Sequence, residues 1–186
     1  MHQEHVDCIV PAAGSSLRMG QWKPVLPFDG STIVQTVVAA ALQVCTRVVL
    51  VTGFRGPELA ALFESDPRVL LVQNEAWQTG MFSSIRAGSL HVRTPRFFVT
   101  LGDMPWIVPA VYEALLRRES GDVIFAMHGG TRGHPVLFRD SVRPAIAAAD
   151  PATGSMREIV KSFRISELAW PDRSVLRDID TEADLP

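Results

Sequence analysis

This chain of 186 residues has few cysteines, no excess of basic residues and no long apolar run. Its two cysteines, Cys8 and Cys45, lie in apolar segments, so we expect buried free thiols in a reducing compartment. Lys and Arg number 18 against 20 Asp and Glu, and the formal charge of −2 argues against a general nucleic-acid-binding protein. The apolar runs are too short to span a membrane, and the N-terminal residues do not resemble a signal peptide. These absences predict a cytoplasmic protein with no nucleic-acid or membrane partner, and the length suits a single domain over 1–186.

Two familiar phosphate-binding motifs are also absent. The first apolar run ends in Pro11-Ala12-Ala13-Gly14-Ser15-Ser16-Leu17-Arg18-Met19-Gly20, and Lys23 follows shortly after. A Walker loop requires Gly-Lys-Ser/Thr and a dinucleotide fingerprint requires G-x-G-x-x-G, and this segment has neither. Small residues nevertheless let backbone N–H groups approach an anion, and Arg18 and Lys23 add positive charge. We therefore predict a phosphate-binding loop at the end of a buried strand, in preference to two solvated surface cations.

Apolar runs alternate with helical patterns along most of the chain. Strands are predicted at 6–12, 47–51, 69–72, 97–101 and 123–126, and helices at 32–44 (with Ser31 as N-cap), 57–63, 82–91 and 108–118. The pattern weakens later, where 133–138 indicates a short strand, antiparallel or at an edge, 155–163 a helix and 175–179 a late strand. The alternation predicts an α/β fold with a mostly parallel sheet and helices on both faces.

This fold class predicts where a ligand would bind. Ligands of open α/β sheets bind at the carboxyl ends of the strands, so 13–23 and 102–105 should line one crevice. Asp103 then either caps the following helix or binds Mg²⁺, which takes one or two carboxylates with phosphate and water, and position alone does not decide between them. Asp178 and Asp180 would share one face of a strand and offer a second carboxylate, but their spacing favours a helix start capped by Asp180 or Thr181.

Three other features allow two interpretations each. The loop 74–84 is rich in hydrogen-bonding groups that suit a base or sugar, and it is equally typical of a surface loop with Trp77 packed inward. His134 is expected to be structural, because no second histidine lies at metal-ligand spacing. Ser15 and Ser16 have no evident histidine partner, so the sequence predicts neither a zinc site nor a nucleophilic triad.

Taken in order, these motifs resemble the nucleotidyltransferase family that activates the molybdenum cofactor. The resemblance runs nearly end to end, through the segments 7–10, 12–23, 26–28, 51–56, 80–84, 102–105, 133–137 and 178–181. It implies a Rossmann-like fold of the nucleotide-diphospho-sugar transferase type that uses a nucleoside triphosphate, Mg²⁺ and a phosphorylated acceptor. The implied reaction transfers CMP from CTP to the terminal phosphate of molybdopterin and releases pyrophosphate.

The resemblance also assigns residues to roles. Asp103 matches the family's metal-binding aspartate and Asp180 a second metal-side position. Ala12-Ala13-Gly14 is similar to the cytidine-using form, whereas guanylyl-transferring relatives tend to have a second glycine, and Pro11 departs from the more usual Leu or Thr. The expected catalytic residues are Arg18, Lys23 and Asp103, and the expected nucleotide-binding residues are Ala12, Ala13, Gly14, Ser15, Ser16, Arg18, Lys23, Asn74, Gly80, Ser83 and Ser84.

Two alternatives follow from the same motifs. One keeps the enzyme class with GTP or another phosphorylated acceptor. The other is a non-catalytic protein that binds the molybdenum cofactor in a chaperone-like role. In either case a molybdenum hydroxylase apoenzyme, or its chaperone, is a candidate partner.

Overall fold

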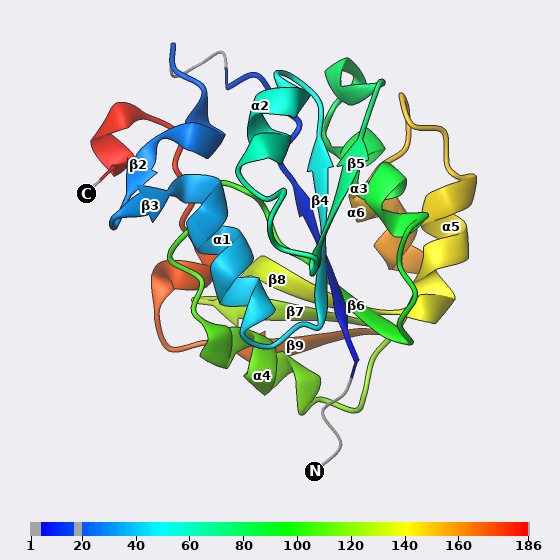
Figure 1. The fold of residues 1–186 in the computed structure, drawn as a ribbon. Helices are drawn as coiled ribbons and strands as arrows, with labels where there is room; N and C mark the ends of the chain where they lie inside the picture. The colour runs from blue at the N-terminus through cyan, green and yellow to red at the C-terminus, as the bar shows by residue number, and fades with distance from the viewer. Residues whose placement is uncertain (1–4, 17–19, 186) are drawn as a thin grey trace.

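A seven-stranded sheet in the order β5-β4-β1-β6-β8-β7-β9 organises the computed structural model, which describes residues 5–16 and 20–185 (Figure 1). Its strands are β1 (Asp7–Pro11), β4 (Arg47–Thr52), β5 (Val69–Gln73), β6 (Arg96–Val99), β7 (Val123–His128), β8 (Thr131–Arg139) and β9 (Ile165–Ala169). The helices are α1 (Ile33–Leu42), α2 (Gly56–Ala61), α3 (Met81–Ser89), α4 (Pro109–Leu116), α5 (Arg143–Ala148) and α6 (Met156–Ile159). A small hairpin, β2 (Pro27–Phe28) and β3 (Ser31–Thr32), precedes α1.

The predicted α/β architecture is confirmed. Strands β5, β4, β1 and β6 pair in parallel, and β9 pairs in parallel with β7. Helices α1, α2 and α4 contribute to the apolar cluster on one face, and α3, α5 and α6 pack against the other. The helices therefore cover both faces, as the alternation of strands and helices predicts.

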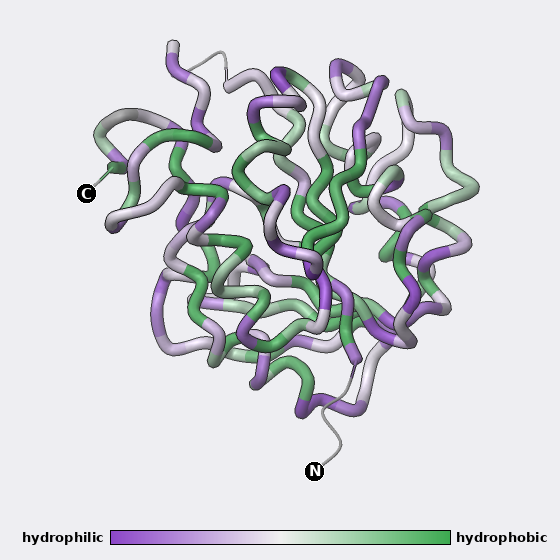
Figure 2. Tube along the Cα trace, viewed as in Figure 1, coloured by the Kyte–Doolittle hydropathy of each residue, from purple (hydrophilic) through white to green (hydrophobic). Residues whose placement is uncertain are grey.

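The strands separate the two apolar layers by simple alternation. In β1, Cys8 and Val10 belong to one cluster and Ile9 to the other. Successive side chains of a strand point to opposite faces, so a continuous apolar run is the pattern of a strand covered on both sides. In Figure 2 the hydrophobic colour follows the middle of the molecule, where β4 and β5 lie, and the hydrophilic colour is concentrated in the peripheral loops. Both cysteines are buried and free, as predicted.

Strand β8 is antiparallel to both of its neighbours, β6 and β7, and lies inside the sheet. The predicted antiparallel direction is confirmed, but an edge position is wrong. The sequence suggested an edge because Pro135 cannot donate a hydrogen bond to a ladder. The structure accommodates Pro135 because pairing with β6 begins only at Val136, and a register shift in β7 falls between Phe125 and Met127.

Some other boundaries differ from the prediction. Residues 175–179 do not form a strand: a short 3₁₀-helix, η6 (Arg173–Leu176), precedes an irregular segment. The edge strand next to β7 is β9, and β5 forms the other edge of the sheet. Val175 and Ile179 are fully buried, so their apolar character reflects anchoring in the core rather than strand pairing. The N-cap of α1 is Thr32 rather than Ser31, because the Thr32 hydroxyl accepts the Gln35 N–H. No helix in the described ranges has the length and apolar character needed to cross a membrane.

Candidate nucleotide-binding site

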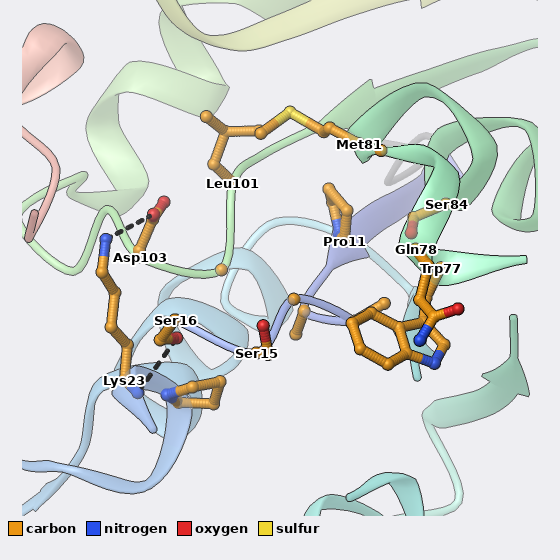
Figure 3. A pocket seen from close by; sticks show the side chains of 16 residues that line it. Pro11, Ser15, Ser16, Lys23, Trp77, Gln78, Met81, Ser84, Leu101 and Asp103 are labelled. Atoms are coloured by element: carbon orange, nitrogen blue, oxygen red, sulfur yellow. Dashed lines mark hydrogen bonds and ion pairs between the residues drawn. The ribbon is translucent and has the colours of Figure 1, made fainter. Parts of the chain in front are cut away.

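A pocket of about 650 Å³ opens where β1 and β6, two neighbouring parallel strands, reach their carboxyl ends (Figure 3). The loop after β1 forms one wall and the loop after β6 a second, so the predicted crevice between these loops is confirmed. The segment from 77 to 84 closes a third side. The lining residues are Pro11, Ala12, Ala13, Gly14, Ser15, Ser16, Lys23, Pro24, Trp77, Gln78, Gly80, Met81, Ser84, Leu101, Gly102 and Asp103.

The loop after β1 is fixed at both ends and open in its middle. Its start continues the sheet, because the Ala12 N–H donates to the Val51 carbonyl (2.9 Å) and the Ala13 carbonyl accepts from the Phe54 N–H (3.0 Å). At Gly14 an added Cβ would meet no atom of the described residues within 4 Å. The loop therefore offers open space next to its backbone, which is what close approach by a phosphate requires.

The far end of this loop turns at Ser16, which has a positive φ of 54°. The Ser16 hydroxyl accepts the backbone N–H of Lys23 at 3.2 Å, and this bond joins the loop to the 3₁₀-helix η2 (Lys23–Val25). Ser15 and Ser16 line the pocket beside Lys23. Arg18 lies outside the described residues, so its predicted phosphate contact stays a prediction.

Lys23 carries the charge that the structure places in the pocket. Its ammonium lies 2.9 Å from Asp180 Oδ1 and 3.7 Å from Asp103 Oδ2, and its side chain is only 12% exposed. The two carboxylates come from distant parts of the sequence and converge on one cation. The Ile179 N–H donates to the Asp103 carbonyl at 2.9 Å, which holds the C-terminal segment against the loop after β6.

The conformation around Asp180 is the start of a short helix, which the spacing favoured, and not the alternative of a strand. A 3₁₀-helix, η7 (Glu182–Asp184), begins just after it, in line with the helix-start interpretation. The Asp184 carboxylate accepts the N–H groups of Asp180 (3.1 Å) and Thr181 (2.8 Å). This arrangement fixes the backbone of Asp180 and leaves its carboxylate beside Lys23.

Asp103 does not cap the following helix, since α4 begins at Pro109 with Val108 as its N-cap. Burial raises the pKa of Asp103 above that of an ordinary aspartate, the Lys23 ammonium opposes this rise, and Asp178 and Asp180 add to it. In that environment a nearby cation stabilises the ionised form of the carboxylate. Within the described ranges, no group of three or more His, Cys, Asp and Glu side chains forms a metal cluster, so a metal here would have two protein carboxylates at most to bind, Asp103 and Asp180.

The segment 74–84 separates into a buried support and an exposed wall. The Asn74 amide donates to the hydroxyls of Ser83 (2.8 Å) and Ser84 (3.0 Å), and all three side chains are buried. Of the four residues predicted to bind nucleotide here, Gly80 and Ser84 line the pocket, and Asn74 and Ser83 stand behind that wall. Nucleotide contact by any of them stays a prediction.

Several pocket residues were missed in the sequence, because their types are not diagnostic. Trp77 packs against Phe54, with ring centroids 5.7 Å apart, and also lines the pocket. Contact of this loop with a base or sugar stays a prediction. Gln78, Met81 and Leu101 line it as well (Figure 3). Their only signal in the sequence is proximity to the predicted motifs.

The fold and this pocket are those of a nucleotide-binding α/β protein. The model of the MobA-like NTP transferase domain matches residues 8–168, and the chain belongs to this family. It is 33% identical to the molybdenum cofactor cytidylyltransferase of Escherichia coli over 96% of this chain and 93% of that protein. It is 28% identical to the nicotine blue oxidoreductase of Paenarthrobacter nicotinovorans over 93% of this chain and 91% of that protein.

Similarity of fold extends to more distant proteins. A nucleotidyl transferase from Methanothermobacter superposes with a TM-score of 0.83 at 19% identity, covering 97% of this chain and 94% of that one. At this identity the likeness shows the fold alone. Relatives 24% and 29% identical in sequence are named probable molybdenum cofactor guanylyltransferases.

Proposed function

We propose that this protein transfers CMP from CTP to the terminal phosphate of molybdopterin and releases pyrophosphate. One observation carries the proposal: a phosphate-binding type of loop, 12–16, lines one pocket together with Lys23 and Asp103. This pocket stands in a chain that is 33% identical, over nearly its whole length, to a molybdenum cofactor cytidylyltransferase. Another relative that matches nearly the whole chain is named an oxidoreductase. Overall sequence similarity is therefore weaker evidence for the reaction than the pocket is.

The reaction asks the protein to position two anions that repel each other. The acceptor phosphate is already a nucleophile, so no side chain has to remove a proton from it. Catalysis then consists of aligning the acceptor oxygen, the α-phosphorus and the leaving pyrophosphate, and of stabilising the charge that develops. The open backbone at Gly14 and the Lys23 ammonium would hold the β- and γ-phosphates, together with Arg18.

Mg²⁺ is the proposed cofactor, and Asp103 and Asp180 would hold it. The donor set fits, because Mg²⁺ is bound by one or two carboxylates and completes its shell with phosphate and water oxygens. The structure already has a cation, the Lys23 ammonium, beside both carboxylates. When bound, the metal supplies charge neutralisation at the phosphates.

Selection of cytosine is proposed to depend on the small residues at the start of the loop. Ala12 and Ala13 are buried and packed, since a Cβ at Gly53 would lie 2.8 Å from the Ala13 Cβ and a Cβ at Gly102 would lie 3.2 Å from the Ala12 Cβ. This packing fixes the position of the Ala12 and Ala13 backbone, which forms the floor of the pocket. A glycine in place of Ala13 would deepen the floor, which suits the larger purine of the guanylyl-transferring relatives.

A pyrophosphate-release assay tests the proposal. CTP, GTP, ATP and UTP are each combined with molybdopterin, with MgCl₂ or with EDTA. We expect release with CTP and MgCl₂ that is at least tenfold faster than with GTP and absent with EDTA. Faster release with GTP would refute the cytidylyl assignment, and stable molybdopterin binding without release from any nucleotide would favour a cofactor-binding protein. A molybdenum hydroxylase apoenzyme as product acceptor is tested separately by pull-down with the loaded protein.

A further inference from the structure

A second cavity, of about 560 Å³, adjoins the nucleotide pocket. Met81 lines both, and it is one of the few large apolar side chains exposed on the described surface, with 54% of its area accessible. Figure 3 shows Met81 at the edge of the first pocket. The lining residues of the second cavity are Met81, Ile85, Val99, Phe125, Arg132, His134, Val136, Phe138, Met156, Arg157, Val160, Lys161 and Ile165.

The cavity is a slot between the sheet and the helices on one face. On the sheet side, His134, Val136 and Phe138 alternate along β8 and therefore point to the same face. On the opposite side lie Ile85 of α3 and Met156 of α6. The apolar side chains on both sides suit a fused ring system, and the volume is in the range of small-molecule sites.

Few of the residues that line this cavity are polar, and His134 is one of them. His134 Nδ1 lies 3.4 Å from the Val99 carbonyl, which can only accept, so Nδ1 carries the proton and Nε2 is an acceptor. Burial lowers the pKa of His134, which favours this neutral form. A neutral imidazole that accepts a hydrogen bond matches the N–H groups of a heteroaromatic ring.

The rim of the cavity is cationic. Arg132 and Lys161 have carboxylate partners, Glu167 at 2.7 Å and Glu158 at 2.8 Å. Arg157 forms no salt bridge within the part of the chain that the structure describes, and its side chain lies on the exposed surface. The rim therefore has charge available for an anionic ligand.

The cavity also lies at a suitable distance from the carboxylates. Val99 lines the second cavity and Asp103 the first, and the two residues are only four positions apart along the chain. At about 3.3 Å per residue this separation is at most about 13 Å. A molecule of two or three fused rings with a phosphate arm is long enough to occupy the cavity and present its phosphate beside Asp103.

We propose that this cavity binds the fused heterocyclic ring system of the phosphorylated acceptor, with its phosphate arm passing Met81 toward the nucleotide pocket. The inference rests on the proposed function, for which the acceptor is molybdopterin, a pterin-derived ring system with a terminal phosphate. It assigns the residues that recognise the acceptor and separates them from those that hold the nucleotide. His134 and Arg157 are the polar contacts, and the apolar walls supply the stacking surface.

Two variants test the assignment. Met156→Trp places a bulky ring in the slot from a short surface helix, and Arg157→Glu reverses the rim charge. The matched control is Arg117→Glu, an exposed arginine at the end of α4, which packs on the other face of the sheet. The dissociation constants of molybdopterin, kept under anaerobic conditions, and of CTP are both measured by calorimetry. Melting temperatures confirm that each variant is folded.

We expect Met156→Trp and Arg157→Glu each to weaken molybdopterin binding at least tenfold, with CTP binding unchanged within twofold. The control should change neither constant by more than twofold. Unchanged molybdopterin binding in both folded variants would overturn the cavity assignment. The pyrophosphate assay on the unmodified protein keeps the two proposals apart. Normal turnover with unaffected variants refutes the cavity alone, and absent turnover with tight, variant-sensitive binding refutes only the transfer reaction.

Discussion

Lys23→Met removes the cation between the two carboxylates and keeps the apolar stem of the side chain. The ammonium lies 2.9 Å from Asp180 and 3.7 Å from Asp103. A pair of charges about 4 Å apart near a protein surface interacts by about 4 kcal/mol. The Asp180 and Asp103 side chains are 50% and 30% exposed, so water screens much of that energy. We therefore expect the free energy of unfolding to change by no more than about 1 kcal/mol.

The effect on transfer should be much larger. A fixed charge aimed at the developing negative charge is typically worth about 3 kcal/mol in the transition state, or a factor of about 100 to 1,000 in rate. In a pyrophosphate-release assay, kcat/KM for CTP should fall by about that factor. Lys23→Arg keeps the charge and serves as the control, with a smaller loss expected because the guanidinium changes the geometry.

Metal binding gives an independent measurement. Removing the ammonium frees both carboxylates from a competing cation, so Mn²⁺ should bind more tightly to Lys23→Met than to the unmodified protein in the absence of nucleotide. Paramagnetic titration measures this constant without turnover. A kcat/KM within threefold of normal, or a loss of activity that only follows a fall in melting temperature, would refute the reasoning.

Three further predictions concern single side chains. Because burial raises the pKa of Asp103, its ionisation opposes folding, so Asp103→Asn should abolish turnover yet raise the melting temperature at neutral pH. That gain should disappear as the pH falls below the ordinary pKa of aspartate, where the unmodified residue is protonated in both the folded and the unfolded state. Gly53→Ala should destabilise the protein by about 1 to 3 kcal/mol in urea denaturation, because its Cβ would lie 2.6 Å from the Trp77 Cβ. Asp7→Asn should destabilise by about 3 kcal/mol, because the buried carboxylate accepts two hydrogen bonds from Arg47, at 3.0 and 2.7 Å.

For each of these three predictions, a particular result would contradict the reasoning. A melting temperature of Asp103→Asn below that of the unmodified protein at neutral pH would contradict the assigned pKa direction. Gly14→Ala is the control for Gly53→Ala: its Cβ would meet no atom of residues 5–16 and 20–185 within 4 Å, so stability should be unchanged while the KM for CTP rises. An Asp7→Asn cost below about 1 kcal/mol would mean that the pair with Arg47 adds little.

Local patterns were enough to predict much of the first two-thirds of the fold. The predicted strands β1, β4, β5, β6 and β7 are short apolar or β-branched runs bounded by turn residues, and the mostly parallel order follows from the helices between them. The hairpin of β2 and β3 was not predicted. The later part was less accessible. Strand β9, Ile165–Ala169, contains a charged residue and lies at an edge, and α5, Arg143–Ala148, is short, so neither has a strong periodic signal.

The candidate site also contains some residues that the sequence pointed to and others that it did not. The loop 12–16 was found from composition, because small residues after a buried strand are themselves the chemical signal. The position of Asp103 after a strand placed it at the same edge of the sheet, and only the family resemblance assigned it a metal-binding role. Met81 and Gln78 have no such signal, and their places in the pocket depend on how the segment before α3 folds. Asn74 and Ser83 have hydrogen-bonding side chains that the fold directs to each other.

The sequence by itself determined an α/β protein with a phosphate-binding type of loop at the end of its first strand, because both properties are encoded by neighbouring residues. Only the tertiary structure decided that Lys23 meets Asp180, a residue 157 positions away, and that both lie beside Asp103. It also placed β8 inside the sheet and opened a second cavity between β8 and α6. These contacts join distant segments, and distant contacts depend on the packing of the whole chain rather than on any local pattern.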